Sequence, residues 1–138
     1  MSAKRVVVDT NVVVSALTAG GVPQTVLKGW IAREFQALIS EELKQEINEV
    51  LRRSKFISVD KKRRIILGTL FNLALIIKPK KIKKPVFPDE KDHFLYELAV
   101  EGEALAIVTG DKGLLKTKRV SGIEVLSPAQ FCKKFRIK

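Results

Sequence analysis

The sequence predicts an α/β domain with a largely parallel sheet and helices on both faces of that sheet. Short apolar runs alternate along the chain with longer segments whose apolar residues recur at helical spacing, which is the pattern of βαβ units. Residues that begin or end helices, such as Ser127-Pro128, separate the two kinds of segment. The 138 residues contain no internal repeat and no Ser/Gly-rich linker, so we expect one domain over residues 1–138.

The N-terminal half shows two strand patterns and three helix patterns. The first apolar run is rich in Val, which favours a strand, and it ends in the polar tripeptide Asp-Thr-Asn. Pro23 suits the first turn of a helix after a Gly-Gly break, and Ser40 and Asp60 are of the kind that caps helices. We therefore expect, in order, a strand at 4–9, a helix from 23 to about 34, a strand at 36–39, a helix from 40 to about 53 and a helix that begins at 60.

The C-terminal half continues the alternation after a lysine-rich segment. Residues 78–84 contain Pro79 and are followed by Pro85, so they are predicted to form a loop. The remaining patterns predict a helix from 88 to 101 that Gly102 closes, a strand at 104–108, a turn at 109–111, a strand at 123–126 and a helix that opens at 127–128.

Four acidic residues are placed to point toward one region of such a fold. Asp9 and Asp111 directly follow apolar strands, and the sites of parallel α/β folds lie outside the carboxyl ends of the strands. Glu46 and Asp92 lie closer to the apolar stripes of their helices than the neighbouring acids do. Asp89 is more simply explained as a helix N-cap. The alternative at this point is a set of unrelated surface acids and caps.

Convergence of these four carboxylates would require a cation. Two unit charges about 5 Å apart repel each other by roughly 3 kcal/mol at an effective dielectric constant of about 20. Without a neutralising cation, the carboxylates would therefore raise one another's pKa. Oxygen ligands select Mg²⁺ or Mn²⁺ over zinc, and a single His and a single Cys in the chain argue against a zinc site.

The chain is strongly basic, which favours a nucleic acid as its partner. It has 26 Lys+Arg against 15 Asp+Glu, a formal net charge of +11. Clustered basic residues are typical of phosphate binding. Such a cluster directly precedes Asp89, and we expect it to contact the phosphate backbone; the alternative is a solvated loop. Its members are Lys78, Lys80, Lys81, Lys83 and Lys84.

Four segments, taken in order, resemble the motifs of the PIN-domain nucleases. They are VVVDTNVVVSAL with Asp9, LKQEINEVL with Glu46, DEKDHFLYELA with Asp92 and VTGDKGLL with Asp111. The likeness extends over essentially the whole chain. Its specificity comes from the order of the four segments, since each is common by itself. The chain looks most like the bacterial and archaeal VapC-like group, the toxins of toxin–antitoxin pairs.

The resemblance implies a three-layer α/β/α fold and a metal-dependent endoribonuclease. In the family, one or two Mg²⁺ or Mn²⁺ ions are held by acids at the positions of Asp9, Glu46, Asp92 and Asp111. Water cleaves the RNA phosphodiester bond and leaves 5′-phosphate and 3′-hydroxyl ends. The resemblance also implies two protein partners, a small antitoxin and a second copy of the chain.

Three further positions carry supporting roles in this interpretation. Polar residues at the positions of Asn11 and Thr109 orient the metal ligands in the family. Asp89 and Asp92 are three residues apart, and either can serve as the third acid. We favour Asp92, because it lies on the inward flank of its helix, with Asp89 as a secondary ligand through water.

Other functions remain open from the sequence. The chain can be an RNA- or antitoxin-binding PIN module without turnover, an RNA-processing nuclease unrelated to toxins, or a DNA-directed nuclease. We expect a cytoplasmic protein that does not enter a membrane. Asp9 and Asn11 interrupt the apolar N-terminal run, and the longest uncharged stretch, 65–77, is too short to span a bilayer.

Overall fold

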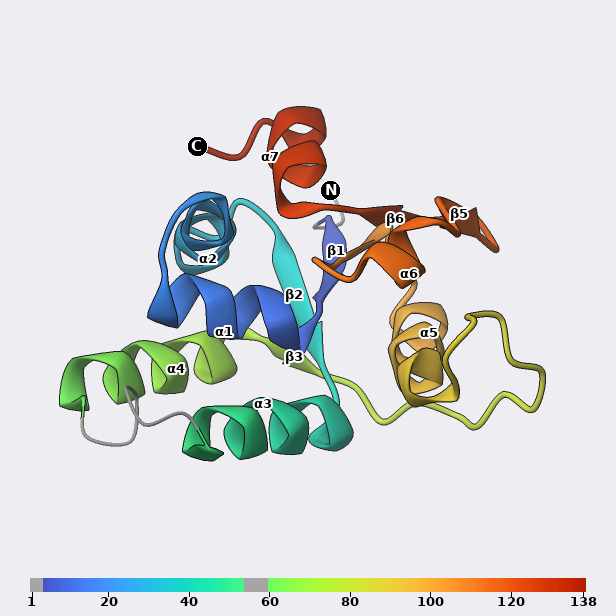
Figure 1. Ribbon diagram of the computed structural model, residues 1–138, viewed down its shortest axis with the longest axis horizontal. Coiled ribbons are helices and arrows are strands. Elements are labelled where there is room, and N and C mark those ends of the chain that lie inside the picture. Colours follow the sequence, from blue (N-terminus) through green and yellow to red (C-terminus); the bar gives the residue numbers. More distant parts are fainter. Residues whose placement is uncertain (1–3, 54–59) are drawn as a thin grey trace.

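The computed structural model describes residues 4–53 and 60–138, which form a six-stranded sheet surrounded by helices (Figure 1). The strands are β1 (Arg5–Val8), β2 (Gln36–Ile39), β3 (Leu75–Ile76), β4 (Ala106–Val108), β5 (Arg119–Val120) and β6 (Ile123–Leu126). Their order in the sheet is β3-β2-β1-β4-β6-β5, and only the β5–β6 pair is antiparallel. The predicted α/β class with a mostly parallel sheet is confirmed.

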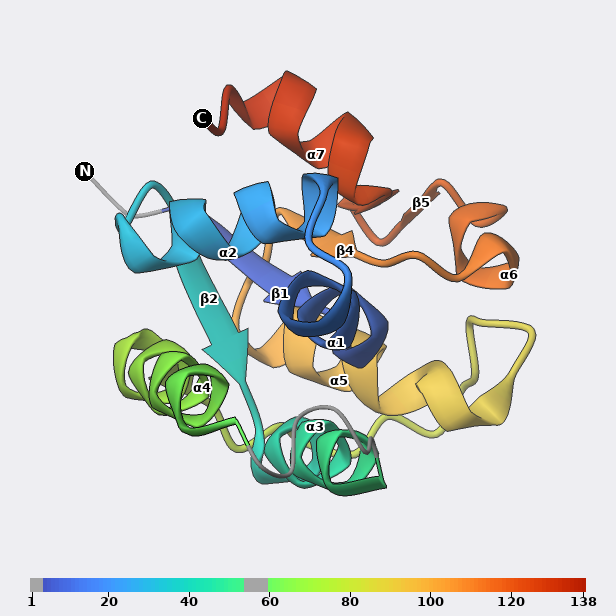
Figure 2. The same cartoon turned by 60° about the vertical axis from the view of Figure 1, so that its left-hand side comes forward.

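Helices cover both faces of this sheet, which confirms the three-layer arrangement. They are α1 (Thr10–Thr18), α2 (Val22–Ile31), α3 (Glu41–Arg53), α4 (Lys61–Leu73), α5 (His93–Glu101), α6 (Lys112–Leu115) and α7 (Pro128–Phe135), with a short 3₁₀ helix, η1 (Glu90–Asp92), before α5. The two views show α2 and α7 together on one side of the sheet and α5 on the other (Figures 1 and 2). Helix α3 contacts both α1 and α5, so it lies along the carboxyl-end edge of the central strands.

The core is built from the central strands and the apolar stripes of the helices. The valines of β1 are fully buried because parallel strands β2 and β4 flank β1 on both sides. The Trp30 indole nitrogen in α2 donates a hydrogen bond to the Leu70 carbonyl in α4 at 3.1 Å. Phe131 of α7 packs edge-on against Phe35, with ring centroids 5.1 Å apart. These contacts fix α2, α4 and α7 relative to the sheet.

Most predicted elements are present, with small shifts at their ends. The strands at 36–39 and 123–126 have the expected bounds, and the strand at 104–108 is shorter, at 106–108. The capping predictions are confirmed: Asp60 accepts from the Arg63 amide at 3.2 Å, and Ser127 forms a capping box with Gln130. The segment 78–84 forms neither helix nor strand, as expected for a loop.

Other elements differ from the prediction. Helix α1 was not expected, because its β-branched valines follow a strand without an apparent break; Asp9 accepts from the Thr10 amide and begins the helix. The helix expected from residue 88 begins as η1, because Asp89 caps that 3₁₀ turn, and α5 starts at His93. The short elements β3, β5 and α6 were also not expected. Among the described residues, no helix is both long and apolar enough to cross a membrane.

Candidate active site

Asp9 occupies the carboxyl end of β1, where it is buried and held by hydrogen bonds. Its side chain is 6% exposed. One carboxylate oxygen accepts from the Thr10 amide at 2.7 Å, and the other accepts from the Thr109 hydroxyl at 2.8 Å. Burial raises the pKa of Asp9 to about 6; these two hydrogen bonds lower it, and the charges of Glu46 and Asp111 raise it further. The fold therefore holds a carboxylate that is costly to ionise.

The end of β4 lies directly beside Asp9. Strands β1 and β4 pair in parallel with Val8 opposite Val108, so Asp9 and Thr109 leave the sheet side by side. The Thr109 hydroxyl also accepts from the Asp111 amide at 3.0 Å. Asp111 caps α6, its carboxylate accepting from the Gly113 amide at 2.7 Å. Adjacent parallel strands thus bring together two acids that are far apart in the sequence.

Asn11 joins the same two strand ends through its side-chain amide. Its carbonyl oxygen accepts from the Gly110 amide at 2.9 Å. Its nitrogen lies 3.3 Å from an Asp9 carboxylate oxygen and 3.4 Å from the Thr109 hydroxyl. The structure therefore places Asn11 and Thr109 where they restrain the acids at both strand ends.

Glu46 and Asp92 approach Asp9 from helices. Glu46 projects from α3, and the Thr10 hydroxyl donates a hydrogen bond to its carboxylate. Asp92 stands at the start of α5. Burial is the main cause that raises the pKa of Asp92 to about 6, followed by the charges of Asp9 and Asp111 and then by other nearby carboxylates. Each helix thus contributes one acid to the end of the sheet.

The four acids expected from the sequence line a single pocket. Its volume is about 330 Å³, and it lies between α1, α3 and the starts of α5 and α6. It is lined by Asp9, Thr10, Asn11, Val14, Ser15, Glu46, Val50, Asp92 and Asp111. Since no basic side chain is among them, nothing in the lining neutralises the four carboxylates.

Asp89 and the five loop lysines lie outside this pocket. The Asp89 carboxylate accepts from the Lys91 amide at 3.0 Å, which is the N-cap role that its sequence position indicates. The loop lysines are exposed and lie in the chain between β3 and η1. The structure therefore brings Asp92, and not Asp89, together with the other three acids.

Sequence reasoning missed Thr10 as part of this site. Its hydroxyl holds Glu46, while its backbone amide donates to Asp9, so Thr10 links two of the acids. A hydroxyl residue directly after a strand-terminal acid was the available signal. It was overlooked because α1 was not expected, and only a helix beginning at residue 10 turns this side chain toward α3.

The donor set of the pocket fits a divalent cation of the Mg²⁺ or Mn²⁺ type. Carboxylate oxygens are the ligands these ions prefer. The pKa values of Asp9 and Asp92 are raised mainly by burial and further by the charges of neighbouring carboxylates, which a bound cation would offset. Within residues 4–53 and 60–138, no three His, Cys, Asp or Glu side chains converge closely enough to hold an ion as they stand. The four acids therefore line one pocket, but their carboxylates do not meet at a single point.

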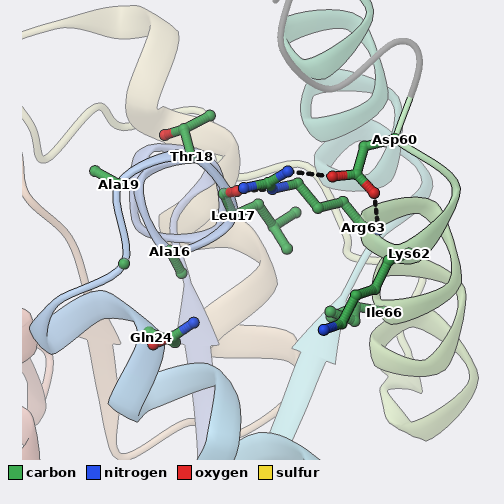
Figure 3. Close-up of a pocket in the computed structure, with 10 residues that line it drawn as sticks. Ala16, Leu17, Thr18, Ala19, Gln24, Asp60, Lys62, Arg63 and Ile66 are labelled. Carbon is green, nitrogen blue, oxygen red and sulfur yellow. Dashed lines mark hydrogen bonds and ion pairs between the residues drawn. The ribbon is translucent and has the colours of Figure 1, made fainter.

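A second cavity has a different lining, which includes the ion pair of Asp60 and Arg63 (Figure 3). Its volume is about 510 Å³, and it lies between α1, α2 and α4. The Arg63 guanidinium there pairs with Asp60 and donates to the Leu17 carbonyl, so it closes the C-terminal end of α1. None of the four acids lines this cavity. The bond from Arg63 to Leu17 joins α4 to α1.

Two solved structures have a similar fold. The crystal structure of VapBC2 from Rickettsia felis, bound to a DNA fragment from their promoter, contains a chain with a TM-score of 0.62 and 17% identity; the match covers 89% of this chain and 98% of that one. PAE2754 from Pyrobaculum aerophilum matches with a TM-score of 0.65 and 12% identity, over 98% of this chain and 91% of that chain. No curated protein matches the sequence.

At these identities the two structures establish the fold. The family follows from the sequence itself, because a model of the PIN domain matches residues 5–113, well over half of the chain. The matched range includes all four acids of the pocket as well as Asn11 and Thr109. The chain therefore belongs to the PIN domain family.

Proposed function

We propose that this protein is a metal-dependent endoribonuclease that hydrolyses RNA to 5′-phosphate and 3′-hydroxyl ends. The observation that carries the proposal is the pocket in which Asp9, Glu46, Asp92 and Asp111 gather at the carboxyl end of the sheet. Four carboxylates so placed destabilise the fold unless a cation joins them. Membership of the PIN domain family supports the same reading of the pocket.

The four acids would hold one or two Mg²⁺ or Mn²⁺ ions. A bound ion of this kind supplies a Lewis acid for the phosphate and lowers the pKa of water. The chain's own residues would prepare the pocket for it. Thr109 and Asn11 hold the Asp9 carboxylate in one orientation, and Thr10 does the same for Glu46. The lysines of the 78–84 loop would bind the RNA backbone, and Asp89 would assist Asp92 through water.

A matched pair of variants on α3 tests the catalytic proposal. Glu46→Gln removes a carboxylate that lines the pocket, whereas Glu49→Gln makes the same chemical change at an exposed position three residues away. Purified full-length protein would be incubated with single-stranded and structured RNA in Mn²⁺, and the ends of the products would be analysed. We expect cleavage by the parent and by Glu49→Gln, and none by Glu46→Gln or in EDTA.

The result also separates this proposal from its alternatives. Cleavage that survives both Glu46→Gln and EDTA would contradict the metal mechanism. Salt-dependent RNA binding without metal-stimulated cleavage of any RNA would favour a binding module without turnover. Preferential cleavage of branched DNA in a competition experiment would favour a DNA-directed nuclease.

We further propose a cytoplasmic toxin whose partner is a small antitoxin. The support is the similarity in fold to a chain of VapBC2 from Rickettsia felis. The test is to look for a short reading frame next to this one and to co-express the two. A toxin role predicts a co-purifying complex that no longer cleaves RNA, and light scattering would show whether the chain itself forms a homodimer. Without such a reading frame, an RNA-processing role is the better reading.

A further inference from the structure

One face of α5 holds the backbone of the lysine-rich loop. The Glu97 carboxylate accepts a hydrogen bond from the Ile82 amide at 2.7 Å, and the His93 Nε2 lies 2.5 Å from the Ile82 carbonyl. The Glu101 carboxylate accepts from the Lys80 amide at 3.3 Å. Residues 93, 97 and 101 are spaced by four and so share one side of the helix. Both polar groups of the Ile82 backbone are therefore bound by α5.

Glu97 is the central member of this contact. It is 5% exposed and does not line the acidic pocket, so the proposed catalytic function does not use it. A buried carboxylate is costly unless hydrogen-bond donors surround it, and here the Ile82 amide donates directly while His93 Nε2 lies 3.7 Å away. A carbonyl oxygen only accepts, so His93 donates from Nε2 to Ile82. Releasing the loop would leave Glu97 without its backbone donor.

This attachment determines where the loop lysines lie. The backbone amides of Lys80 and Ile82 donate to carboxylates of α5, and Lys81 between them lines a cleft of about 360 Å³ together with Lys83 and Lys91. Lys78, Lys80 and Lys84 do not line this cleft. In Figure 1 the loop extends outward beside α5 before it returns to the start of that helix. The five lysines are therefore not equivalent.

The cleft and the acidic pocket are lined by neighbouring residues of the same two segments. Glu42 lines the cleft and lies four residues, about 6 Å along the helix axis, before Glu46 on α3. On the other side, His93 and Phe94 line the cleft and directly follow Asp92 of the pocket. A strand lying over the four acids would thus pass next into the cleft between α3 and the loop.

The lysines of the cleft are available for a ligand. Within the two described ranges, no ion pair involves Lys81 or Lys83. The exposed carboxylates of Glu42 and Glu90 also line the cleft and would oppose a phosphate. Lys81 and Lys83 are two of the three lysines that line the cleft, with Lys91, and the contact with α5 holds the backbone that carries these two.

We propose that Lys81 and Lys83, held over the cleft by Glu97 with His93 and Glu101, bind the phosphates that flank the cleavage site in RNA. This inference rests on the proposed function, because it takes RNA as the substrate of the adjacent acidic pocket. It assigns the phosphate contacts of the basic loop to two residues, and it gives Glu97 the role of a positioning residue.

The first experiment compares two double variants of equal charge change. Binding of a labelled single-stranded oligoribonucleotide of mixed sequence would be measured by fluorescence anisotropy at several salt concentrations, in EDTA so that the readout does not need turnover. Each lost phosphate contact reduces the salt slope by about 0.7. We expect Lys81→Ala/Lys83→Ala to reduce the salt slope of RNA binding by about 1.4, and Lys78→Ala/Lys80→Ala to reduce it by clearly less. Lys28→Ala/Lys133→Ala, on α2 and α7, is the control for net charge.

The outcomes separate the subsite from the proposed function. Equal losses of salt slope in the two loop variants would overturn the subsite. If the parent still cleaves RNA, the proposed function stands. Absence of cleavage together with the expected order of binding losses would overturn the catalytic function and support the RNA subsite. A control variant that loses as much as Lys81→Ala/Lys83→Ala would overturn the subsite, because only net charge would then matter.

The second experiment tests the positioning role of Glu97. Glu97→Leu removes the acceptor of the Ile82 amide, whereas Glu97→Gln keeps an oxygen that can accept this bond. We expect Glu97→Leu to reproduce the slope loss of Lys81→Ala/Lys83→Ala although both lysines are present, and Glu97→Gln to restore the parent slope. Thermal unfolding would verify that both variants fold. A folded Glu97→Leu with the parent slope would overturn the positioning role, and the lysine variants remain decisive if Glu97→Leu does not fold.

Discussion

The hydroxyl of Thr109 donates a 2.8 Å hydrogen bond to the carboxylate of Asp9, across the ends of two adjacent parallel strands. Both side chains are buried, so this bond has no water to replace it. The same hydroxyl accepts from the Asp111 amide. Thr109 therefore connects the two strand-end acids through a single oxygen atom.

We predict that Thr109→Val lowers the free energy of unfolding at neutral pH by about 1–3 kcal/mol. Valine keeps the shape of threonine but removes the hydroxyl, which leaves an ionised, buried Asp9 with one donor fewer. Thr109→Ser keeps the hydroxyl and is expected to lose less. Urea unfolding in EDTA measures both variants, and equal losses would show that the methyl group, and not the hydrogen bond, matters at this position.

Asp9→Asn is predicted to change how stability depends on pH. Because burial raises the pKa of Asp9 from 3.8 to about 6, the folded state binds a proton more tightly than the unfolded state does. The free energy of unfolding therefore falls as pH rises from about 4 to about 6 and stays low above that range. One pKa unit corresponds to about 1.4 kcal/mol, so in EDTA the neutral Asn variant should exceed the parent by about 1–3 kcal/mol near neutral pH.

Urea unfolding of the parent and of Asp9→Asn at several pH values checks this prediction. The difference between the two proteins should shrink as the pH approaches about 4, where the parent carboxyl is protonated in both states. A difference that stays constant with pH would mean that burial of the charge is not its cause.

Two glycines in helices are predicted to respond in opposite ways to alanine. A Cβ at Gly29 of α2 would lie 2.5 Å from a methyl carbon of Ile137, so Gly29→Ala must displace the C-terminal residues and should destabilise the protein. At Gly68 of α4, a Cβ would meet no atom within 4 Å in the described part of the chain. Gly68→Ala should therefore add about 0.5–1 kcal/mol through helix propensity. Thermal unfolding measures both, and stabilisation by Gly29→Ala would contradict the close packing.

The sequence predicted the parts of the fold that rest on local signals. Ser127 and Asp60 were identified as helix caps because their side chains act within one turn. Helix α1 was missed because a run of valines after a strand has the same local pattern in either structure. In the helix, Val12 and Val13 are buried in the core, and such packing against distant segments leaves no local pattern in the sequence. The two-residue strands β3 and β5 carry no pattern of their own, since pairing with β2 and β6 defines them.

Strand ends and helix faces singled out the four acids, but these patterns left open whether the acids meet, and only the resemblance to the PIN-domain nucleases implied it. Asp9 and Asp111 had to meet once β1 and β4 were neighbours, and Glu46 and Asp92 were chosen by helical angle. The restraints on the acids could not be predicted. The hydrogen bond from Thr10 to Glu46 depends on α1, which was not expected. The hydrogen bond from Ile82 to Glu97 likewise joins a loop of irregular conformation to a helix. Neither contact leaves a periodic signal in the sequence.

The final prediction concerns stabilisation by a metal ion. A ligand that binds only the folded state adds RT ln(1 + [L]/Kd) to the free energy of unfolding, about 2.7 kcal/mol at one hundred times Kd. Mn²⁺ should therefore stabilise the parent against urea, because an ion in the pocket offsets the repulsion among its carboxylates. Glu46→Gln should lose most of this increment, and Glu49→Gln, an exposed position on the same helix, should keep all of it. Equal stabilisation of both variants would place the ion elsewhere on the protein, whereas no stabilisation of the parent at any Mn²⁺ concentration would contradict a metal site among these acids.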